Sequence, residues 1–331
     1  MLRALAYVPW QFLPTLFRIM IVYYPILAAI GITGNLLAIV VLSRGKCGLS
    51  KGITFYLVAM AVADILFAIN DVVLNAIHSL YFDYTFLDIT PVCSLRLVLK
   101  SAVTHMSVWF TVAFTFDRLV AICCELKASY CSERTAAVVV GVISSLSCFI
   151  SIPWYFMYEP SEILNNVPWY CQYKEAYYTS ATWIVYHWFD TIITPFVPFF
   201  LILLMNVVTV RHILAANRIR RNLLHQKSNS GNDAEMENRR KSIILLFAIS
   251  GSFIVLWLMY VLDFILSRTL DKYFYQSYRD PVYVVQHVTD MLKVLSCCTN
   301  TVIYALTQSK FRKDVKYLVI YPFKHIFKLF K

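Results

Sequence analysis

Residues 18–43 read RIMIVYYPILAAIGITGNLLAIVVLS, an apolar run in which no charged side chain follows Arg18. A helix needs about 20 mainly apolar residues to cross the hydrocarbon core of a bilayer. Six further runs of this kind follow, at 53–80, 90–124, 134–157, 181–215, 240–267 and 282–306. The sequence therefore predicts seven membrane-spanning segments between residues 18 and 306.

These runs are predicted to be helices. They lack the apolar–polar alternation of membrane barrel strands, and only helices or closed barrels satisfy the backbone in lipid. Of the 331 residues, 59% are hydrophobic and 15% are charged, whereas soluble domains are about 45–50% apolar and about 25% charged. We expect an all-α membrane protein, a seven-transmembrane helix bundle.

The 30 basic residues are unevenly distributed. If the N-terminus (1–17), Arg18 at the start of the first run, and the second, fourth and sixth connections face outside, they carry six of these residues. Three more lie within the apolar runs, and the other 21 lie toward the opposite face. This positive-inside pattern predicts an extracellular N-terminus and a cytoplasmic C-terminus in the plasma membrane. The basic residues that produce the net charge of +11 then lie mostly beside the anionic lipid of the inner leaflet. No nucleic acid partner is therefore expected.

Two polar segments lie outside the runs. Residues 216–242 include KSNSGND at 227–233, a composition that favours a cytoplasmic loop. The tail, 307–331, mixes aromatic residues with Lys and Arg, which predicts a short amphipathic eighth helix on the inner leaflet. No second soluble domain is expected.

Two of the nine cysteines, Cys93 and Cys171, fall on the predicted outer and oxidising face. We expect a disulfide between them that ties the fourth connection over the bundle; the alternative is two free thiols. No CxxC pair or His/Cys cluster indicates a zinc site.

Four motifs occur in order along the chain. They are LVAMAVAD at 57–64, Asp117-Arg118-Leu119 placed 24 residues after Cys93, FIVLW at 253–257 and NTVIY at 300–304. They resemble the LxxxxxAD, Asp-Arg-Tyr, FxxxW and NPxxY motifs of rhodopsin-like G-protein coupled receptors. Leu119 replaces the Tyr of the second motif, and Thr301 replaces the Pro of the last. The resemblance extends over about residues 25–320.

The resemblance implies a receptor, not an enzyme, that binds an extracellular ligand and activates heterotrimeric G proteins. Pro198 followed by Asn206 is similar to peptide receptors of the family. The pattern from His105 to Val112 resembles a vertebrate orphan receptor associated with aromatic amino acids and small peptides. An aromatic amino acid or a short peptide is therefore the expected ligand.

The chain departs from the family in two helices. Ile143 lies near the place where the fourth helix usually carries Trp, and Met259 stands where the sixth helix usually has a kinking Pro. Because a missing Pro restores a backbone hydrogen bond, we expect a straighter sixth helix.

The resemblance also implies a polar cluster in the middle of the bundle, formed by Asp64, Ser107, Ser296 and Asn300. These residues match the family's sodium and water cluster, and oxygen ligands suit a hard cation. The cluster holds either an allosteric sodium ion at Asp64 or a hydrogen-bonded network without an ion. No other cofactor is expected.

Ionisable groups inside a bilayer cost roughly 2.5–3.5 kcal/mol at a helix centre and usually face the bundle interior. Lys100 is expected either to pair with Asp290 across the bundle or to bind a carboxylate of the ligand. Asp290 and Lys293 share a helix face. Trp183 and Trp188 either line the pocket or lie in the interfacial belt. The expected ligand pocket consists of Lys100, Thr104, His105, His187, Asp190, Trp257, Tyr260, Phe264, Asp290 and Lys293.

By the same resemblance, the residues of the G-protein switch are Asp117, Arg118, Asn206 and Tyr304. Arg118 is expected to pair with Asp117 at rest. Arg239 replaces the second acid that the family usually places at the foot of the sixth helix, which predicts a weaker resting lock and measurable basal activity.

Two alternatives remain open. A divergent opsin needs a Lys on the seventh helix, but Lys293 lies seven residues before Asn300, whereas opsins have it six before, where Val294 stands here. A seven-helix ion or solute transporter or channel would also use intramembrane charges, although the paired halves with broken helices that transporters often show are not visible.

Overall fold

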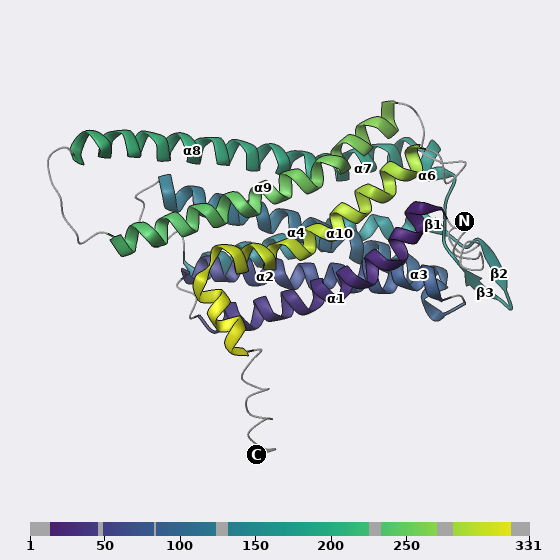
Figure 1. The fold of residues 1–331 in the computed structure, drawn as a ribbon. Coiled ribbons are helices and arrows are strands. Elements are labelled where there is room, and N and C mark those ends of the chain that lie inside the picture. Colours follow the sequence, from purple (N-terminus) through teal and green to yellow (C-terminus); the bar gives the residue numbers. More distant parts are fainter. Residues whose placement is uncertain are drawn as a thin grey trace, which may run out of the picture.

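The computed structural model describes residues 14–45, 49–82, 84–123, 132–224, 233–269 and 281–318. Within these ranges, seven long helical stretches lie alongside one another as a bundle (Figure 1). The predicted seven-helix fold is confirmed. The first four stretches are α1 (Thr15–Ser43), α2 (Lys51–Phe67) with η3 (Ala68–Ile77) and α3 (His78–Tyr81), α4 (Thr90–Cys123), and α5 (Glu133–Ser151) with η5 (Ile152–Met157). The last three are α7 (Ala181–Thr191) with η6 (Ile192–Phe196) and α8 (Val197–Leu224), α9 (Asp233–Thr269), and α10 (Pro281–Thr307).

Six of the described stretches are long and apolar enough to cross a membrane. The seventh, α10, has 27 residues but contains Gln286, Asp290 and Lys293, which make it more polar. Large apolar side chains lie exposed on the outside of the bundle, among them Phe149, Val138 and Leu306. Such exposure is unfavourable in water and favourable in lipid.

Helix starts follow local capping chemistry. The Ser50 hydroxyl accepts a hydrogen bond from the backbone N–H of Ile53 and caps α2. The Ser132 hydroxyl accepts from the N–H of Thr135 and caps α5. A side-chain oxygen at this position satisfies a backbone donor that the helix itself leaves unpaired.

The second and fifth stretches each contain a π-helical segment. In the second it is η3, which carries Asn70, Asp71 and Asn75. In the fifth it is η6, where Thr194 before Pro195 has non-helical backbone angles. A π-helical segment rotates the side chains that follow it relative to an α-helix, and such segments often lie at functional sites.

The core runs through the bundle from Phe17 and Leu80 near one end to Phe311 at the other. Fully buried side chains from α2, α4, α9 and α10 meet there, including Leu57, Phe114, Leu245, Leu246 and Tyr304. Helices α1 and α10 approach closely at Gly31, where an added Cβ would lie 3.0 Å from the Cys298 sulfur. Asn35 donates to the Cys297 carbonyl at 2.9 Å, and the Thr301 hydroxyl donates to Asn35 Oδ1 at 3.2 Å.

A β-hairpin structure covers the end of the bundle where α1 begins (Figure 1). Strand β1 (Tyr158–Glu159) pairs with β4 (Gln172–Tyr173), and β2 (Glu162–Leu164) pairs with β3 (Val167–Trp169), both antiparallel. Short helices η4 (Phe86–Asp88) and α6 (Ala176–Thr179) flank it. The predicted disulfide between Cys93 and Cys171 is present and ties the hairpin to the start of α4.

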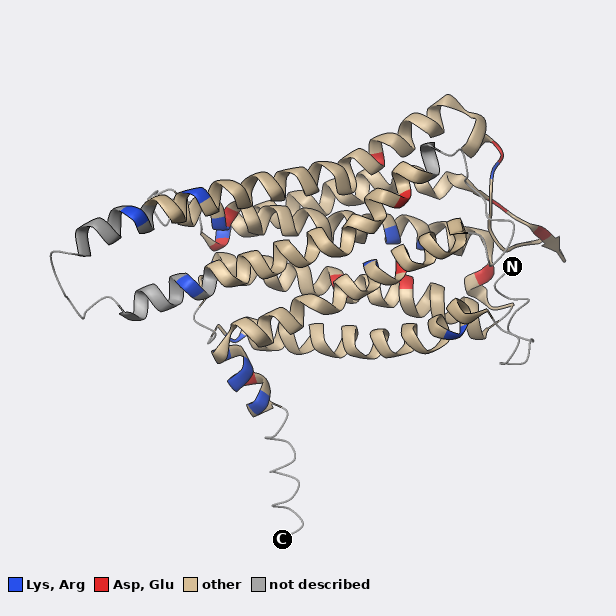
Figure 2. Ribbon diagram, turned by 45° about the horizontal axis from the view of Figure 1, so that its top comes forward, with Lys and Arg blue, Asp and Glu red and all other residues tan. Residues whose placement is uncertain are grey.

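Most of the residues coloured as Lys or Arg in Figure 2 lie at the end of the bundle opposite the hairpin. At that end the predicted loop 216–242 is wrong in its extent, because α8 continues to Leu224 and α9 already begins at Asp233. Arg, Glu, Lys and Leu have good helix propensity, so polar composition alone did not end these helices. The sixth stretch, α9, is one uninterrupted helix of 37 residues, as its missing Pro predicts.

The predicted eighth helix is present over residues 309–318. Phe311 is buried against Tyr304, and Val315 and Leu318 pack on the core. Arg312 and Lys313 lie on the exposed face, so the described part is amphipathic. The rest of the predicted segment, 319–331, lies outside the described residues.

Candidate functional site

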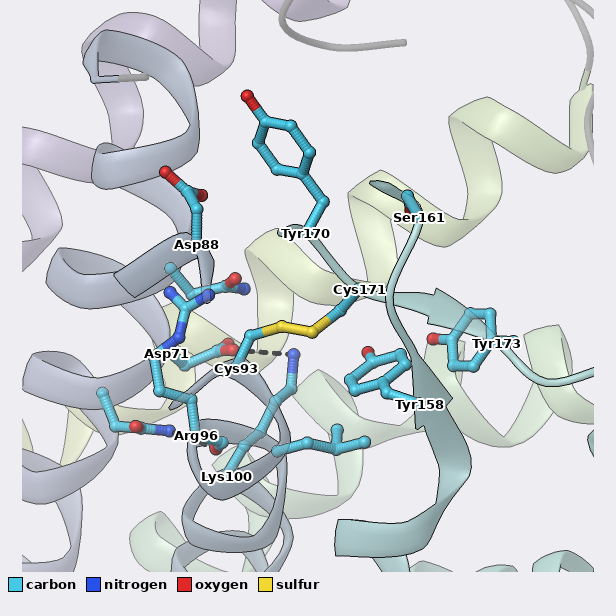
Figure 3. A pocket seen from close by; sticks show the side chains of 13 residues that line it. Asp71, Asp88, Cys93, Arg96, Lys100, Tyr158, Ser161, Tyr170, Cys171 and Tyr173 are labelled. Carbon is cyan, nitrogen blue, oxygen red and sulfur yellow. Dashed lines mark hydrogen bonds and ion pairs between the residues drawn. A yellow bond between two sulfur atoms is a disulfide. The ribbon is translucent and has the colours of Figure 1, made fainter. Parts of the chain in front are cut away.

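A cavity of ≈ 620 Å³ lies beneath the hairpin, between η3, α4 and the strands (Figure 3). The disulfide Cys93–Cys171 and Tyr170 lie on its outer side, toward the hairpin. The full lining is Asn70, Asp71, Asn75, Asp88, Cys93, Arg96, Leu97, Lys100, Tyr158, Ser161, Tyr170, Cys171 and Tyr173. Most of these side chains are polar, which suits a ligand that forms several hydrogen bonds.

An ion pair lies at the inner side of this cavity. Lys100 Nζ is 2.7 Å from Asp71 Oδ1 and joins α4 to η3. The Asp71 side chain is 9% exposed, whereas that of Lys100 is 30% exposed. Lys100 therefore keeps ammonium hydrogens available to the cavity.

The prediction that Lys100 pairs with Asp290 is wrong, because Lys100 pairs with Asp71. Asp290 Oδ1 lies 2.7 Å from Lys293 Nζ, three residues along the same helix. Asp290 remains within electrostatic range of Lys100 as a second, more distant carboxylate. The physical reason is η3, because this π-helical segment places Asp71 on the side of the second stretch that faces α4.

Asn70 and Arg96 form one wall. Asn70 Nδ2 donates to the carbonyl oxygen of Arg96 at 3.0 Å. The Arg96 guanidinium donates in turn to the carbonyl of Leu74 on η3. These reciprocal contacts hold η3 against α4 beside the cavity.

Tyr158 and Tyr173 form the opposite wall, from paired strands β1 and β4. Their ring centroids are 5.1 Å apart. Burial raises the pKa of Tyr158 well above its ordinary value of 10, so its hydroxyl stays neutral. Both rings offer apolar faces with a polar tip, a combination that suits aromatic or peptide ligands.

A second cluster of predicted residues lies between α4 and α7. His105 Nε2 lies 3.1 Å from Asp190 Oδ1, and both side chains are largely buried. Trp154 donates to the same carboxylate oxygen at 3.4 Å. Asp190 therefore joins three helical stretches.

Aromatic residues surround this cluster. His187 Nδ1 lies 3.2 Å from the Tyr177 hydroxyl, and the His187 ring packs edge-on against Phe264. Trp188 also packs against Phe264 and is 42% exposed. These contacts fill the outer space between α7 and α9.

The predicted residues of α9 and α10 contact one another. Lys293 Nζ lies 4.7 Å from the centroid of the Tyr260 ring, a favourable cation–π distance. Trp257 packs against Tyr260 and donates to the Ser296 hydroxyl at 3.3 Å.

Of the ten predicted pocket residues, Lys100 alone lines the cavity beneath the hairpin. Thr104 is not part of the lining; its hydroxyl donates a hydrogen bond to the Lys100 carbonyl.

The polar cluster in the middle of the bundle is formed in part as expected. Asp64 is 1% exposed; its Oδ1 accepts from the Ser107 hydroxyl at 3.1 Å and its Oδ2 from Asn300 at 2.8 Å. Ser296 is the exception, because its hydroxyl contacts Trp257. Within the described ranges no Lys or Arg pairs with Asp64, so a buried carboxylate has only neutral partners.

The switch residues lie at the inner end. Arg118 pairs with the carboxylate of its neighbour Asp117, and both are buried. Asn206 on α8 donates to the Ser250 hydroxyl on α9 at 2.8 Å. Tyr304 is 1% exposed, and in the described part of the chain its hydroxyl has no hydrogen-bond partner. The side chain of Arg239 lies outside the described residues.

Sequence reasoning missed most of the cavity lining, above all Asn70 and Tyr158. A signal was present, because Asn70-Asp71 is an adjacent polar pair inside an apolar run, and such residues usually face a functional interior. Tyr170 and Tyr173 flank Cys171, so the predicted disulfide could have placed them over the bundle.

Comparison with known proteins agrees with this architecture. The family described as 7 transmembrane receptor (rhodopsin family) matches residues 34–304. The FMRFamide receptor of Drosophila melanogaster is 23% identical over 87% of this chain and 51% of its own length. Neuromedin-U receptor 2 of Mus musculus is 23% identical over 90% of this chain and 74% of its own. C-C chemokine receptor type 1 of Macaca fascicularis is 25% identical, over 89% and 78%. The chain thus spans about half the length of the FMRFamide receptor.

Proposed function

Because the chain belongs to the rhodopsin family of seven-transmembrane receptors, which are receptors and not enzymes, we propose that it converts binding of a small extracellular ligand into activation of heterotrimeric G proteins. The observation that carries this proposal is the polar cavity beneath the disulfide-tied hairpin, at the end of the bundle opposite Arg118. It receives the ligand at the outer face of the plasma membrane. The basic end, with the eighth helix, faces the cytoplasm and its anionic lipid.

The proposed ligand is a short peptide or an aromatic amino acid. Two of the similar receptors carry peptide names, FMRFamide and neuromedin U. The tyrosine rings and hydrogen-bonding groups of the cavity suit both ligand types. The residues from His105 to Val112 further favour a divergent relative of the vertebrate orphan G-protein coupled receptor 139.

At the inner end, Arg118 is the proposed contact for the G protein. It pairs with Asp117 on its own helix. Opening of α9 away from α4 therefore leaves the pair intact while exposing Arg118. We expect basal signalling above that of cells carrying an empty vector.

The test is ligand-stimulated nucleotide exchange on cells that express the full chain. Aromatic amino acids and short peptides are applied, and G-protein activation is recorded. Arg118→Ala is the matched control, because it should abolish exchange while ligand binding persists. Ligand-driven ion flux without nucleotide exchange would contradict the proposal and favour a transporter or channel.

A sodium ion at Asp64 forms a second part of the proposal. A buried carboxylate with only neutral partners, beside the Ser107 hydroxyl, suits a small monovalent cation. Bound sodium would favour the resting arrangement by its higher affinity for that state. Asp64→Asn should remove the sodium dependence of basal exchange. Unchanged sodium dependence in this variant would refute the proposed sodium ion at Asp64.

A further inference from the structure

The side-chain amide of Asn70 has an orientation that its surroundings fix. Its Nδ2 lies 3.0 Å from the carbonyl oxygen of Arg96, and a carbonyl can only accept a hydrogen bond. The amide nitrogen therefore faces Arg96, and Oδ1 points the other way.

Asn70 Oδ1 is a buried acceptor that lacks a donor. The residue is 7% exposed and lines the cavity, and no described group donates a hydrogen bond to this oxygen. A buried acceptor left in this state is unfavourable, so a donor that reaches it gains more than an ordinary exposed hydrogen bond would give.

Lys100 supplies the complementary group in the same cavity. Its ammonium has three donors, and the ion pair with Asp71 accounts for one contact. The cavity thus presents an acceptor on the η3 wall and a donor at its inner side. The carboxylate of Asp71, next to Asn70 in the chain, adds negative charge at that point.

From this pairing we infer that the cavity binds the C-terminal carboxamide of a short peptide. The NH2 group of the carboxamide donates to Asn70 Oδ1, and its oxygen accepts from Lys100. This inference rests on the proposed function and narrows it to one class of peptide.

A free carboxylate fits the environment of Asn70 poorly. It has no hydrogen to donate to Asn70 Oδ1, and it would bring a negative charge next to Asp71. A site that forms hydrogen bonds to a polar group discriminates against an analogue without that group. The rings of Tyr158 and Tyr173, on the opposite wall, are placed to contact the last side chain of the peptide.

The experiment measures direct binding to the purified full chain in nanodiscs. The probes are short peptides, Phe-Met-Arg-Phe among them, each made once with a carboxamide and once with a free carboxylate. The amide should bind roughly tenfold tighter or more, as expected when one buried polar group is left unpaired. Equal affinity, or tighter binding of the acids, would overturn the inference.

Variants then assign the preference to one residue. Asn70→Ala should bring the amide-to-acid ratio close to one, whereas Asn75→Ala, of the same residue type in the same cavity, should keep it. Asn70→Ser retains a hydroxyl that can accept, so it should restore part of the ratio and serves if Asn70→Ala fails to reach the surface. An amide preference that persists in both Asn70 variants would overturn the role of Asn70.

Failure of this inference is distinguishable from failure of the proposed function. If aromatic amino acids stimulate exchange but no peptide of either form binds, the carboxamide site is wrong and the receptor proposal stands. If neither amino acids nor peptides stimulate exchange, the proposed function and the inference are both overturned.

Discussion

The outer and inner halves of the bundle use charged side chains in different ways. In the outer half, Lys100–Asp71 joins α4 to η3, and the contact of His105 with the Asp190 carboxylate joins α4 to α7, while Lys293–Asp290 lies within α10. The disulfide at Cys93 adds a covalent connection at the same end. In the inner half, the buried pair Arg118–Asp117 joins two neighbours on α4, and the pair between helices, Lys51–Glu133, is exposed.

The link that the structure describes between α8 and α9 at the inner end is a neutral hydrogen bond. Asn206 donates to Ser250, which itself donates to the Leu246 carbonyl of its own helix. Removing one partner of a buried ion pair costs about 3–5 kcal/mol, whereas losing a neutral hydrogen bond costs about 1 kcal/mol. From this contrast we infer that the outer half keeps its shape around a ligand, whereas the inner half changes its shape.

The largest effect is expected where an outer ion pair loses one partner. Lys100→Ala leaves the buried Asp71 carboxylate uncompensated, which costs about 3 kcal/mol, the lower end for buried pairs because the cavity admits some water. Surface expression and the Tm of the purified chain should fall. The exchanged pair Lys100→Asp with Asp71→Lys should restore part of both.

A matched exchange tests the assigned partner. Lys100→Asp with Asp290→Lys should not rescue expression, because Asp290 pairs with Lys293. Rescue by this exchange, without rescue by the first, would mean that the outer half is held by a contact between α4 and α10.

The helices of both halves could be predicted from sequence because bilayer thickness sets the length of an apolar run. The run 90–124, for example, corresponds to α4 (Thr90–Cys123). The disulfide could be predicted as well, since only Cys93 and Cys171 lay on the outer face.

The partner of Lys100 could not be predicted. Spacing along one helix shows that Asp290 and Lys293 share a face, but it carries no distance between helices. The π-helical segment η3 changes which side chains of the second stretch face α4, and no Pro or Gly within it marks this change in the sequence. The orientation of Asn70 Oδ1 could likewise not be predicted, because it depends on the hydrogen bond from Nδ2 to the Arg96 carbonyl.

A moderate effect is expected at the inner link between α8 and α9. Asn206→Ala removes the hydrogen bond to Ser250, worth about 1 kcal/mol, which corresponds to about a fivefold shift toward an arrangement in which α9 has moved away. Basal nucleotide exchange at equal surface expression should rise accordingly. Basal exchange that stays at the wild-type level would show that this bond does not hold the inner half closed.

A smaller effect is expected where α1 meets α10. Thr301→Val removes the hydroxyl that donates to Asn35, while Asn35 keeps its bonds to the Gly31 and Cys297 carbonyls. The loss should be about 0.5–1 kcal/mol and should lower Tm without raising basal exchange, because this contact does not join α8 to α9. A rise in basal exchange as large as that of Asn206→Ala would extend the movable inner half to α10.

The smallest effect is expected at an ion pair of the same chemistry as Lys100–Asp71 but in a different environment. Lys51 Nζ lies 3.4 Å from Glu133 Oε2 and joins α2 to α5 at the inner end, with side chains 85% and 53% exposed. Exposed pairs contribute about 0–1 kcal/mol and weaken with salt, so Lys51→Met should change Tm and basal exchange little. If Lys51→Met lowered Tm as much as Lys100→Ala, charge alone would hold helices at both ends, and the distinction between a fixed outer half and a movable inner half would fail. If Tm stays near wild type, it is burial of the outer pairs that makes the difference.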